Sequence, residues 1–161
     1  MSSLPVIDWL YATPVSSGIR DLLWVVPTVQ SVHILAIAVI FGSAVISDLR
    51  LAGVFATDES VRGVVRRYYP WMRAALLLLL GTGVIMAVGE PDRVLVNSVF
   101  WLKMGLVVLA FSMAWRVRRP YLRPLATSHG TEPQPVRAFA WLSIALWCVV
   151  IICGRWIAYA I

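Results

Sequence analysis

Four long apolar segments constrain the fold of this chain more than any other feature of its sequence. They cover approximately residues 22–47, 71–89, 98–115 and 139–161. Each reaches or approaches the roughly 20 residues that a helix needs to cross the hydrocarbon core of a bilayer. A chain inside lipid must satisfy its own backbone hydrogen bonds, and a helix does so within one segment. The sequence therefore predicts an all-α protein, a transmembrane four-helix bundle.

The composition supports a membrane protein rather than a soluble one. Of the 161 residues, 60% are hydrophobic and 14% are charged, and the mean hydropathy is +0.82. A soluble domain carries about 25% charged residues. So few polar side chains cannot cover an apolar core in water, and the length predicts one integral membrane domain over residues 1–161.

Residues 4–18 precede the first apolar segment and are only moderately apolar. Trp9 and Tyr11 lie among them, and Pro5 and Pro14 interrupt the pattern. Aromatic side chains of this kind anchor short helices at the membrane surface. We expect a short N-terminal interfacial helix here, with a disordered tail as the alternative.

The basic residues are distributed unevenly along the chain, and this predicts an orientation. Ten of the 14 Lys and Arg residues lie in or beside the first and third connections between the apolar segments. The third connection, residues 119–135, is rich in Pro, Ser, Thr and Gly and is expected to be a flexible linker. Basic loops stay in the cytoplasm. We therefore expect a multi-pass membrane protein with both termini, the N-terminus and the C-terminus, outside the cytoplasm. The net charge of +6 then faces anionic lipid, and no nucleic acid partner is expected. The ten residues are Arg50, Arg62, Arg66, Arg67, Arg73, Arg116, Arg118, Arg119, Arg123 and Arg137.

His33 is the first candidate for a functional residue. It lies near the middle of the first apolar segment, and an ionisable residue at that depth marks a functional site by default. Apolar surroundings favour the neutral imidazole, the form that ligates a metal ion or haem iron. Gln30 lies one turn earlier on nearly the same face, and a kink at Pro27 would open room beside the ring. The alternative is a histidine that only hydrogen-bonds between helices.

Lys103 and Arg155 are the next candidates, because both are cations within the outer halves of apolar segments. The carboxylates expected on that side of the membrane all belong to flanking segments. Two such cations would hold a ligand that bears carboxylates, such as haem propionates or a lipid headgroup. Snorkelling of both side chains to the headgroups is the alternative. The flanking carboxylates are Asp8, Asp21, Glu90 and Asp92.

Several other residues limit these hypotheses. His129 falls in the third connection, so the chain does not supply two histidines to one haem. The second ligand would be Met86, Met104 or a His of a partner chain, or the position would stay open. Cys148 and Cys153 are five residues apart on one helix and cannot form a disulfide. The eight Trp residues, Trp147 included, are interpreted as an interfacial aromatic belt.

Several short motifs, spread over almost the whole chain, resemble an uncharacterised family of small bacterial four-helix membrane proteins. In the first half they are Val32-His33-Ile34-Leu35, Phe41-Gly42-Ser43 and Asp48-Leu49-Arg50-Leu51-Ala52-Gly53. In the second half they are Gly81-Thr82-Gly83, Asn97-Ser98-Val99-Phe100-Trp101-Leu102-Lys103-Met104 and Cys153-Gly154-Arg155-Trp156-Ile157. Domains of this family have no assigned function, so the resemblance implies the fold and a location in the bacterial inner membrane, but no activity.

A more distant resemblance connects the histidine of the first span and the lysine that opens a later span with two other groups. These are the haem-binding four-helix protoporphyrinogen oxidases and the copper-resistance membrane proteins. The resemblance implies that His33 is a haem ligand and that Lys103 is a partner of the tetrapyrrole. The oxidases carry a further His about eleven residues after the Lys, where this chain has Ala114 and Trp115. This departure argues against porphyrin oxidase activity.

Together these features predict a membrane protein that binds b-type haem, or a related planar cofactor, in its outer half and transfers electrons. His33 would be the metal ligand, and Lys103, Arg155 and Gln30 would complete the site. The alternative is a non-catalytic accessory or scaffold subunit of a larger membrane complex, in which His33 and Gln30 form interhelical hydrogen bonds. A transporter is less favoured, because four helices enclose little space unless the protein forms an oligomer.

Overall fold

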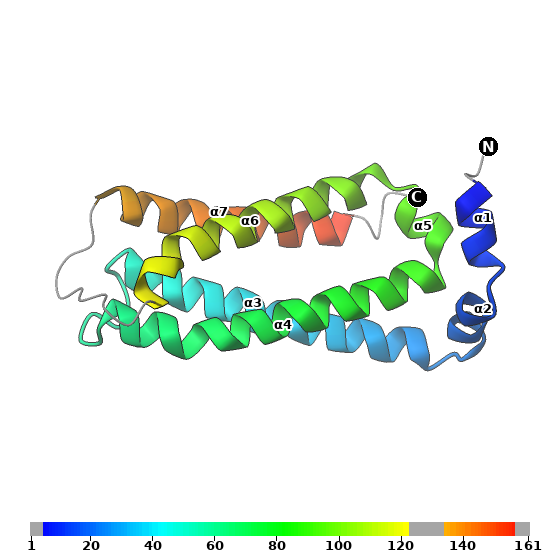
Figure 1. Ribbon diagram of the computed structural model, residues 1–161, viewed down its shortest axis with the longest axis horizontal. Helices are drawn as coiled ribbons and strands as arrows, with labels where there is room; N and C mark the ends of the chain where they lie inside the picture. Colours follow the sequence, from blue (N-terminus) through cyan, green and yellow to red (C-terminus); the bar gives the residue numbers. More distant parts are fainter. Residues whose placement is uncertain (1–4, 123–133, 157–161) are drawn as a thin grey trace.

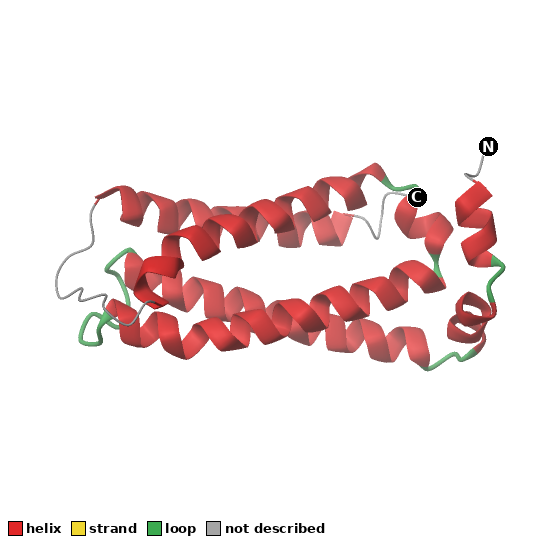
Figure 2. Cartoon of the chain, viewed as in Figure 1, coloured by secondary structure: helices red, strands yellow, loops and turns green. Residues whose placement is uncertain are grey.

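A computed structural model describes residues 5–122 and 134–156, and every regular element in these two stretches is an α-helix (Figure 2). Four helices are long and apolar enough to cross a membrane, as the sequence predicts. They are α3 (Val25–Leu51), α4 (Val61–Gly89), α6 (Ser98–Leu122) and α7 (Gln134–Trp156). The other three are short: α1 (Pro5–Tyr11), α2 (Pro14–Asp21) and α5 (Pro91–Leu95). The predicted all-α class with four candidate membrane spans is confirmed.

The four long helices form a bundle in which each helix packs against two neighbours. Helix α3 contacts α4 and α7, and α6 contacts α7 and α4, with the closest packing between α3 and α4 (Figure 1). The short helices α1, α2 and α5 gather at one end, which we call the cap end (Figure 1). The cap end holds the starts of α3 and α6 and the ends of α4 and α7. We call the other end, where α3 is connected to α4, the loop end.

The long helices extend beyond the apolar segments at the loop end. Helix α4 begins at Val61, ten residues before the apolar segment, and is capped by Ser60, whose side chain accepts a hydrogen bond from the Gly63 backbone. Its 29 residues measure about 43 Å, more than the roughly 30 Å of hydrocarbon. The first and last turns therefore reach the headgroups. Of the predicted linker, residues 119–122 and 134–135 are helical, and residues 123–133 lie outside the described stretches.

The segment before the first span consists of two helices, where the sequence predicts one. The chain breaks at Thr13, whose hydroxyl accepts a hydrogen bond from the Ser16 backbone and so caps α2, with Pro14 in the first turn. Helix α1 contacts α5, and α2 contacts α4. Because these contacts join both short helices to the bundle, they cover its cap end.

Arg20 holds this cap together. Its Nη1 donates to Ser16 Oγ at 2.6 Å and to the Gly89 carbonyl at 3.3 Å. Its Nη2 donates to the Tyr11 carbonyl at 3.0 Å, and the guanidinium lies 3.7 Å from the centre of the Tyr11 ring. One side chain therefore connects α1 and α2 to the end of α4.

Replacing Gly89 with Ala is expected to displace the cap. A Cβ at this position would lie 2.7 Å from Ile19 Cγ2, and because Ile19 is branched at Cβ, α2 itself must move. Overpacking of this kind costs about 1–3 kcal/mol, so we expect a lower midpoint of thermal unfolding in detergent and faster proteolysis of residues 5–21. Gly81→Ala is the control, because a Cβ there meets nothing within 4 Å. Equal stability of both variants would show that α2 does not pack on Gly89.

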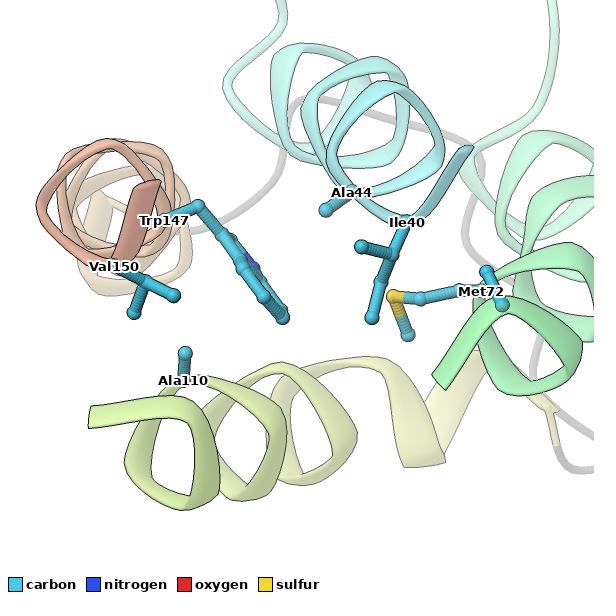
Figure 3. Packing of buried hydrophobic residues seen from close by; sticks show 7 residues of the cluster. Ile40, Ala44, Met72, Ala110, Trp147 and Val150 are labelled. Carbon is cyan, nitrogen blue, oxygen red and sulfur yellow. The ribbon is translucent and has the colours of Figure 1, made fainter. Parts of the chain in front are cut away.

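The apolar core lies in the middle of the bundle, where all four long helices contribute small or compact side chains. Trp147 of α7 points between the helices toward Ile40 and Ala44 of α3, beside Ala110 of α6 and Met72 of α4 (Figure 3). Small residues let helices approach closely in a membrane. The interpretation of Trp147 as part of an interfacial belt is wrong, because its side chain is only 3% exposed.

Candidate functional site

His33 and Thr82 connect the two most closely packed helices in the cap-end half of the bundle. The distance from His33 Nδ1 to Thr82 Oγ1 is 2.7 Å. The half-buried His33 lies about 12 Å along α3 from its start, and the buried Thr82 lies about 10 Å before the end of α4, so both are within the membrane. Gly83 follows Thr82, and a Cβ there would lie 3.8 Å from His33 Cε1. The motif Gly81-Thr82-Gly83 therefore forms part of the wall beside the imidazole.

The hydrogen bonds of Thr82 favour one tautomer of His33. Thr82 Oγ1 donates to the Leu78 carbonyl at 2.7 Å, and a hydroxyl has one proton to donate. His33 Nδ1 then carries its own proton and donates to Thr82, which uses both protons in a continuous chain of hydrogen bonds. If the proton of His33 were instead on Nε2, Thr82 would have to donate to Nδ1 and would lose its hydrogen bond to the Leu78 carbonyl. In the favoured arrangement Nε2 presents a lone pair, and it has no hydrogen-bond partner among the residues that the structure describes.

Lys103 adds a positive charge to the same half of the bundle. The side chain is half-buried on α6 and lies against α7, where a Cβ at Gly154 would be 3.4 Å from the ammonium nitrogen. It is close enough to His33 and to Cys153 to act on both electrostatically. Side chains from all four long helices thus surround one region: His33 from α3, Thr82 from α4, Lys103 from α6 and Cys153 from α7.

The other predicted site residues lie at the edge of this region. Gln30 is exposed, and the hydrogen-bond partner of His33 is Thr82. Arg155 follows Gly154, the α7 residue that Lys103 of α6 approaches. Arg155 is exposed, whereas Lys103 is half-buried. Met86 is half-buried on α4, one turn beyond Thr82. His129 falls outside the described residues.

The chemistry of this region suits a ligand that accepts an electron pair from His33 Nε2 and carries an acidic group for Lys103. The lone pair of a neutral imidazole binds a metal ion, and the ammonium of Lys103 binds carboxylate or phosphate as a point charge. Over residues 5–122 and 134–156, the structure groups no three His, Cys, Asp or Glu side chains in a way that would hold a bare metal ion.

A second polar cluster, in the loop-end half, was missed by the sequence analysis. Arg118 of α6 donates from Nη2 to Asp48 Oδ1 of α3 at 2.6 Å and to the Ala44 carbonyl at 3.2 Å. The two side chains are 1% and 2% exposed. Arg118 was counted with the loop cations, because the apolar segments end at residues 115 and 47. The signal available in the sequence was a pair of opposite charges directly beyond the ends of two spans.

Comparison with known proteins gives one match, to the model of a family described as a family of unknown function, DUF6644, over residues 23–160. This chain belongs to the DUF6644 family. The predicted membership of an uncharacterised family is thereby confirmed. No curated protein and no solved structure matches the sequence.

The DUF6644 region contains the whole four-helix bundle and both polar clusters, whereas α1 and α2 precede it. His33, Thr82, Lys103 and the Asp48–Arg118 pair all belong to the part of the chain that the family model matches.

Proposed function

We propose that this DUF6644 protein binds b-type haem, or a related planar cofactor with acidic substituents, in the cap-end half of its membrane bundle and serves electron transfer. The observation that carries the proposal is the His33–Thr82 hydrogen bond at 2.7 Å, which leaves Nε2 as the ligating atom. Histidines that ligate metals almost always donate their other ring N–H to an oxygen, and this fixes the tautomer and the ring orientation.

The residues present fit such a cofactor in two respects. The imidazole is half-buried within an apolar bundle, and such surroundings keep the ring neutral and available to iron. Lys103 lies in the same half, within electrostatic range of His33, and would pair with a propionate. Arg155, exposed near the end of α7, is the proposed second cation. Met86, half-buried on α4 one turn beyond Thr82, would be a second side chain able to hold the iron.

A bound haem would supply a one-electron redox centre inside the membrane, with a potential set by its axial ligands and its burial. The chain's own contribution is to orient His33 through Thr82, to hold acidic groups with Lys103 and to exclude water with the apolar faces of α3 and α4. Electrons would pass to a quinone or to a partner subunit.

The proposal is tested by the visible absorption spectrum of the protein purified from cells supplied with a haem precursor. We expect a Soret band that shifts on reduction with dithionite, with about one haem per chain. A preparation that is colourless as purified, and stays colourless after titration with hemin in detergent, would overturn the proposal. In that case His33 and Thr82 form an interhelical hydrogen bond in an accessory or scaffold subunit, the function that this bond also supports.

The orientation in the membrane follows from the positive charge of the loop end. We expect the connection between α3 and α4 to lie in the cytoplasm, together with the linker at residues 123–133, and the cap end to lie outside. In a variant without Cys148 and Cys153, Asp58→Cys should react with an impermeant maleimide only after the cells are permeabilised. Val96→Cys, exposed in the cap end, should react in intact cells. The reverse labelling pattern would invert the orientation and place the His33 site near the cytoplasm.

A further inference from the structure

The cluster around Asp48 and Arg118 contains buried polar atoms that form no hydrogen bond with another protein atom in the part of the chain that the structure describes. Among the described residues, five buried side-chain atoms in this half of the bundle have no hydrogen-bond partner. They are Asp48 Oδ2, Arg118 Nε, Arg118 Nη1, Ser143 Oγ and Trp147 Nε1. Buried polar groups in native proteins nearly always have a partner, and where no protein atom serves, the partner is a small ligand. Five such atoms together point to a site.

These atoms belong to one neighbourhood. Ser143 and Trp147 are one turn apart on α7 and both are buried. Ser143 lies close enough to the Asp48 carboxylate for the two side chains to interact, but neither Ser143 Oγ nor Asp48 Oδ2 meets the full geometry of a hydrogen bond. Trp147 packs beside Ala44 (Figure 3), and the carbonyl of Ala44 accepts a hydrogen bond from Arg118. The cluster is therefore shared by α3, α6 and α7.

Apolar residues close the cluster on both sides along the bundle axis. Toward the cap end lies the core around Ile40, Met72 and Ala110. Toward the loop end lies a second apolar cluster built around Leu51, Val65 and Tyr121. A ligand between these two layers is enclosed rather than held in an open vestibule, so it must be small.

The balance of donors and acceptors decides what kind of small ligand fits. Arg118 Nε and Nη1, Trp147 Nε1 and the Ser143 hydroxyl all have protons to donate, whereas Asp48 Oδ2 requires a donor. Chloride only accepts hydrogen bonds, so it would leave Asp48 Oδ2 without a partner. The negative charge of the carboxylate would also repel any anion, phosphate included. Water both donates and accepts. A group of polar atoms of both kinds, enclosed by protein, is what holds internal water.

We propose that Asp48, Arg118, Ser143 and Trp147 form an internal water site within the membrane-embedded bundle. The water joins the carboxylate and the guanidinium to α7, which their direct ion pair does not reach. It also lowers the cost of keeping two charges within the membrane, because each charge gains hydrogen bonds in addition to its partner. This site is separate from the His33 region and does not depend on a cofactor.

The test is a nuclear magnetic resonance measurement of contact between water and the Trp147 indole proton in detergent micelles. The indole signal is assigned by its loss in Trp147→Phe. We expect a cross-peak to long-lived water in the wild-type protein, and its loss in the double variant Asp48→Leu/Arg118→Met, in which the indole signal itself persists. Ser143→Ala, which removes the hydroxyl and leaves the rest of the side chain unchanged, should weaken the cross-peak and serves if the double variant does not fold.

Three results would overturn the proposal. One is a wild-type indole signal without a water cross-peak, which would show a dry cluster. Another is a shift of the indole signal that saturates with added chloride or phosphate, which would show an anion in place of water. A cross-peak that survives in the folded double variant would also contradict it, because the water would then be held by atoms outside the cluster.

Discussion

Replacing Arg118 with Met is expected to destabilise the bundle by about 3–5 kcal/mol, because the Asp48 carboxylate would stay buried without its cation. The pair is formed at 2.6 Å by side chains that are 1% and 2% exposed, so water cannot replace the guanidinium without opening the packing of α3 against α6 and α7. The free energy of unfolding in mixed micelles of increasing denaturing detergent measures the effect. Asp48→Leu should cost a similar amount, since it leaves Arg118 buried without a carboxylate.

The double variant Asp48→Leu/Arg118→Met distinguishes the loss of stability caused by one unpaired buried charge from the contribution of the ion pair to the free energy of unfolding. Removing both charges together is often neutral or stabilising in other proteins, so the double variant should be more stable than either single variant. The exposed pair of Arg67 and Glu59, at 3.1 Å with 60% and 40% exposure, is the matched control, and Arg67→Met should cost at most about 1 kcal/mol. If Arg118→Met were no more harmful than Arg67→Met, the buried pair would not exist in the membrane.

Replacing His33 with Ala is expected to abolish the Soret band of a haem-loaded preparation while the bundle stays folded. The substitution removes the proposed iron ligand but only one interhelical hydrogen bond, worth about 0.6–2 kcal/mol of helix association. The absorption spectrum reports the first effect and circular dichroism the second. His33→Met should retain part of the band, because a thioether binds haem iron but cannot donate to Thr82.

Thr82 provides the matched test of orientation. Thr82→Val keeps the shape of the side chain but removes the oxygen that accepts from His33 Nδ1, and loss of such a partner weakens metal binding about 10–100-fold. Thr82→Ser should bind as the wild type does, and Gly83→Ala should be tolerated because its Cβ would be in ordinary contact with His33. A His33→Ala spectrum identical to that of the wild type would show that another residue holds the iron. Equal affinity of Thr82→Val would show that the hydrogen bond does not orient the ring.

The membrane bundle could be predicted from sequence because its signal is local. An apolar run of about 20 residues specifies a span by its own length, and His33 and Lys103 stand out because each is ionisable within such a run. The residues that contact His33 and Lys103 could not be predicted in this way. Thr82 is 49 positions from His33 and is unremarkable in an apolar segment, so only the packing of α3 on α4 identifies it.

The Asp48–Arg118 pair shows where hydropathy stops being informative. Hydropathy marks the end of a lipid-facing run, whereas α3 and α6 continue to Leu51 and Leu122. Asp48 and Arg118 lie in these extra turns, so the sequence alone suggests that they are loop charges. Only the folded structure brings the two side chains together, because they are 70 residues apart in the chain. Trp147 was misinterpreted for a related reason, since composition cannot distinguish a tryptophan at the membrane surface from one that fills the centre of the bundle.

The apolar layer around Ile40 also has an electrical consequence. His33 and Asp48 are 15 residues apart on α3, about 22 Å along the axis, and the core cluster lies between them. A transmembrane voltage falls mainly across material of low dielectric constant, so most of it falls between these two residues. Moving one elementary charge from one to the other against the voltage would require up to about 2.3 kcal/mol per 100 mV. The two polar clusters of this small bundle therefore sit at different electrical potentials in an energised membrane.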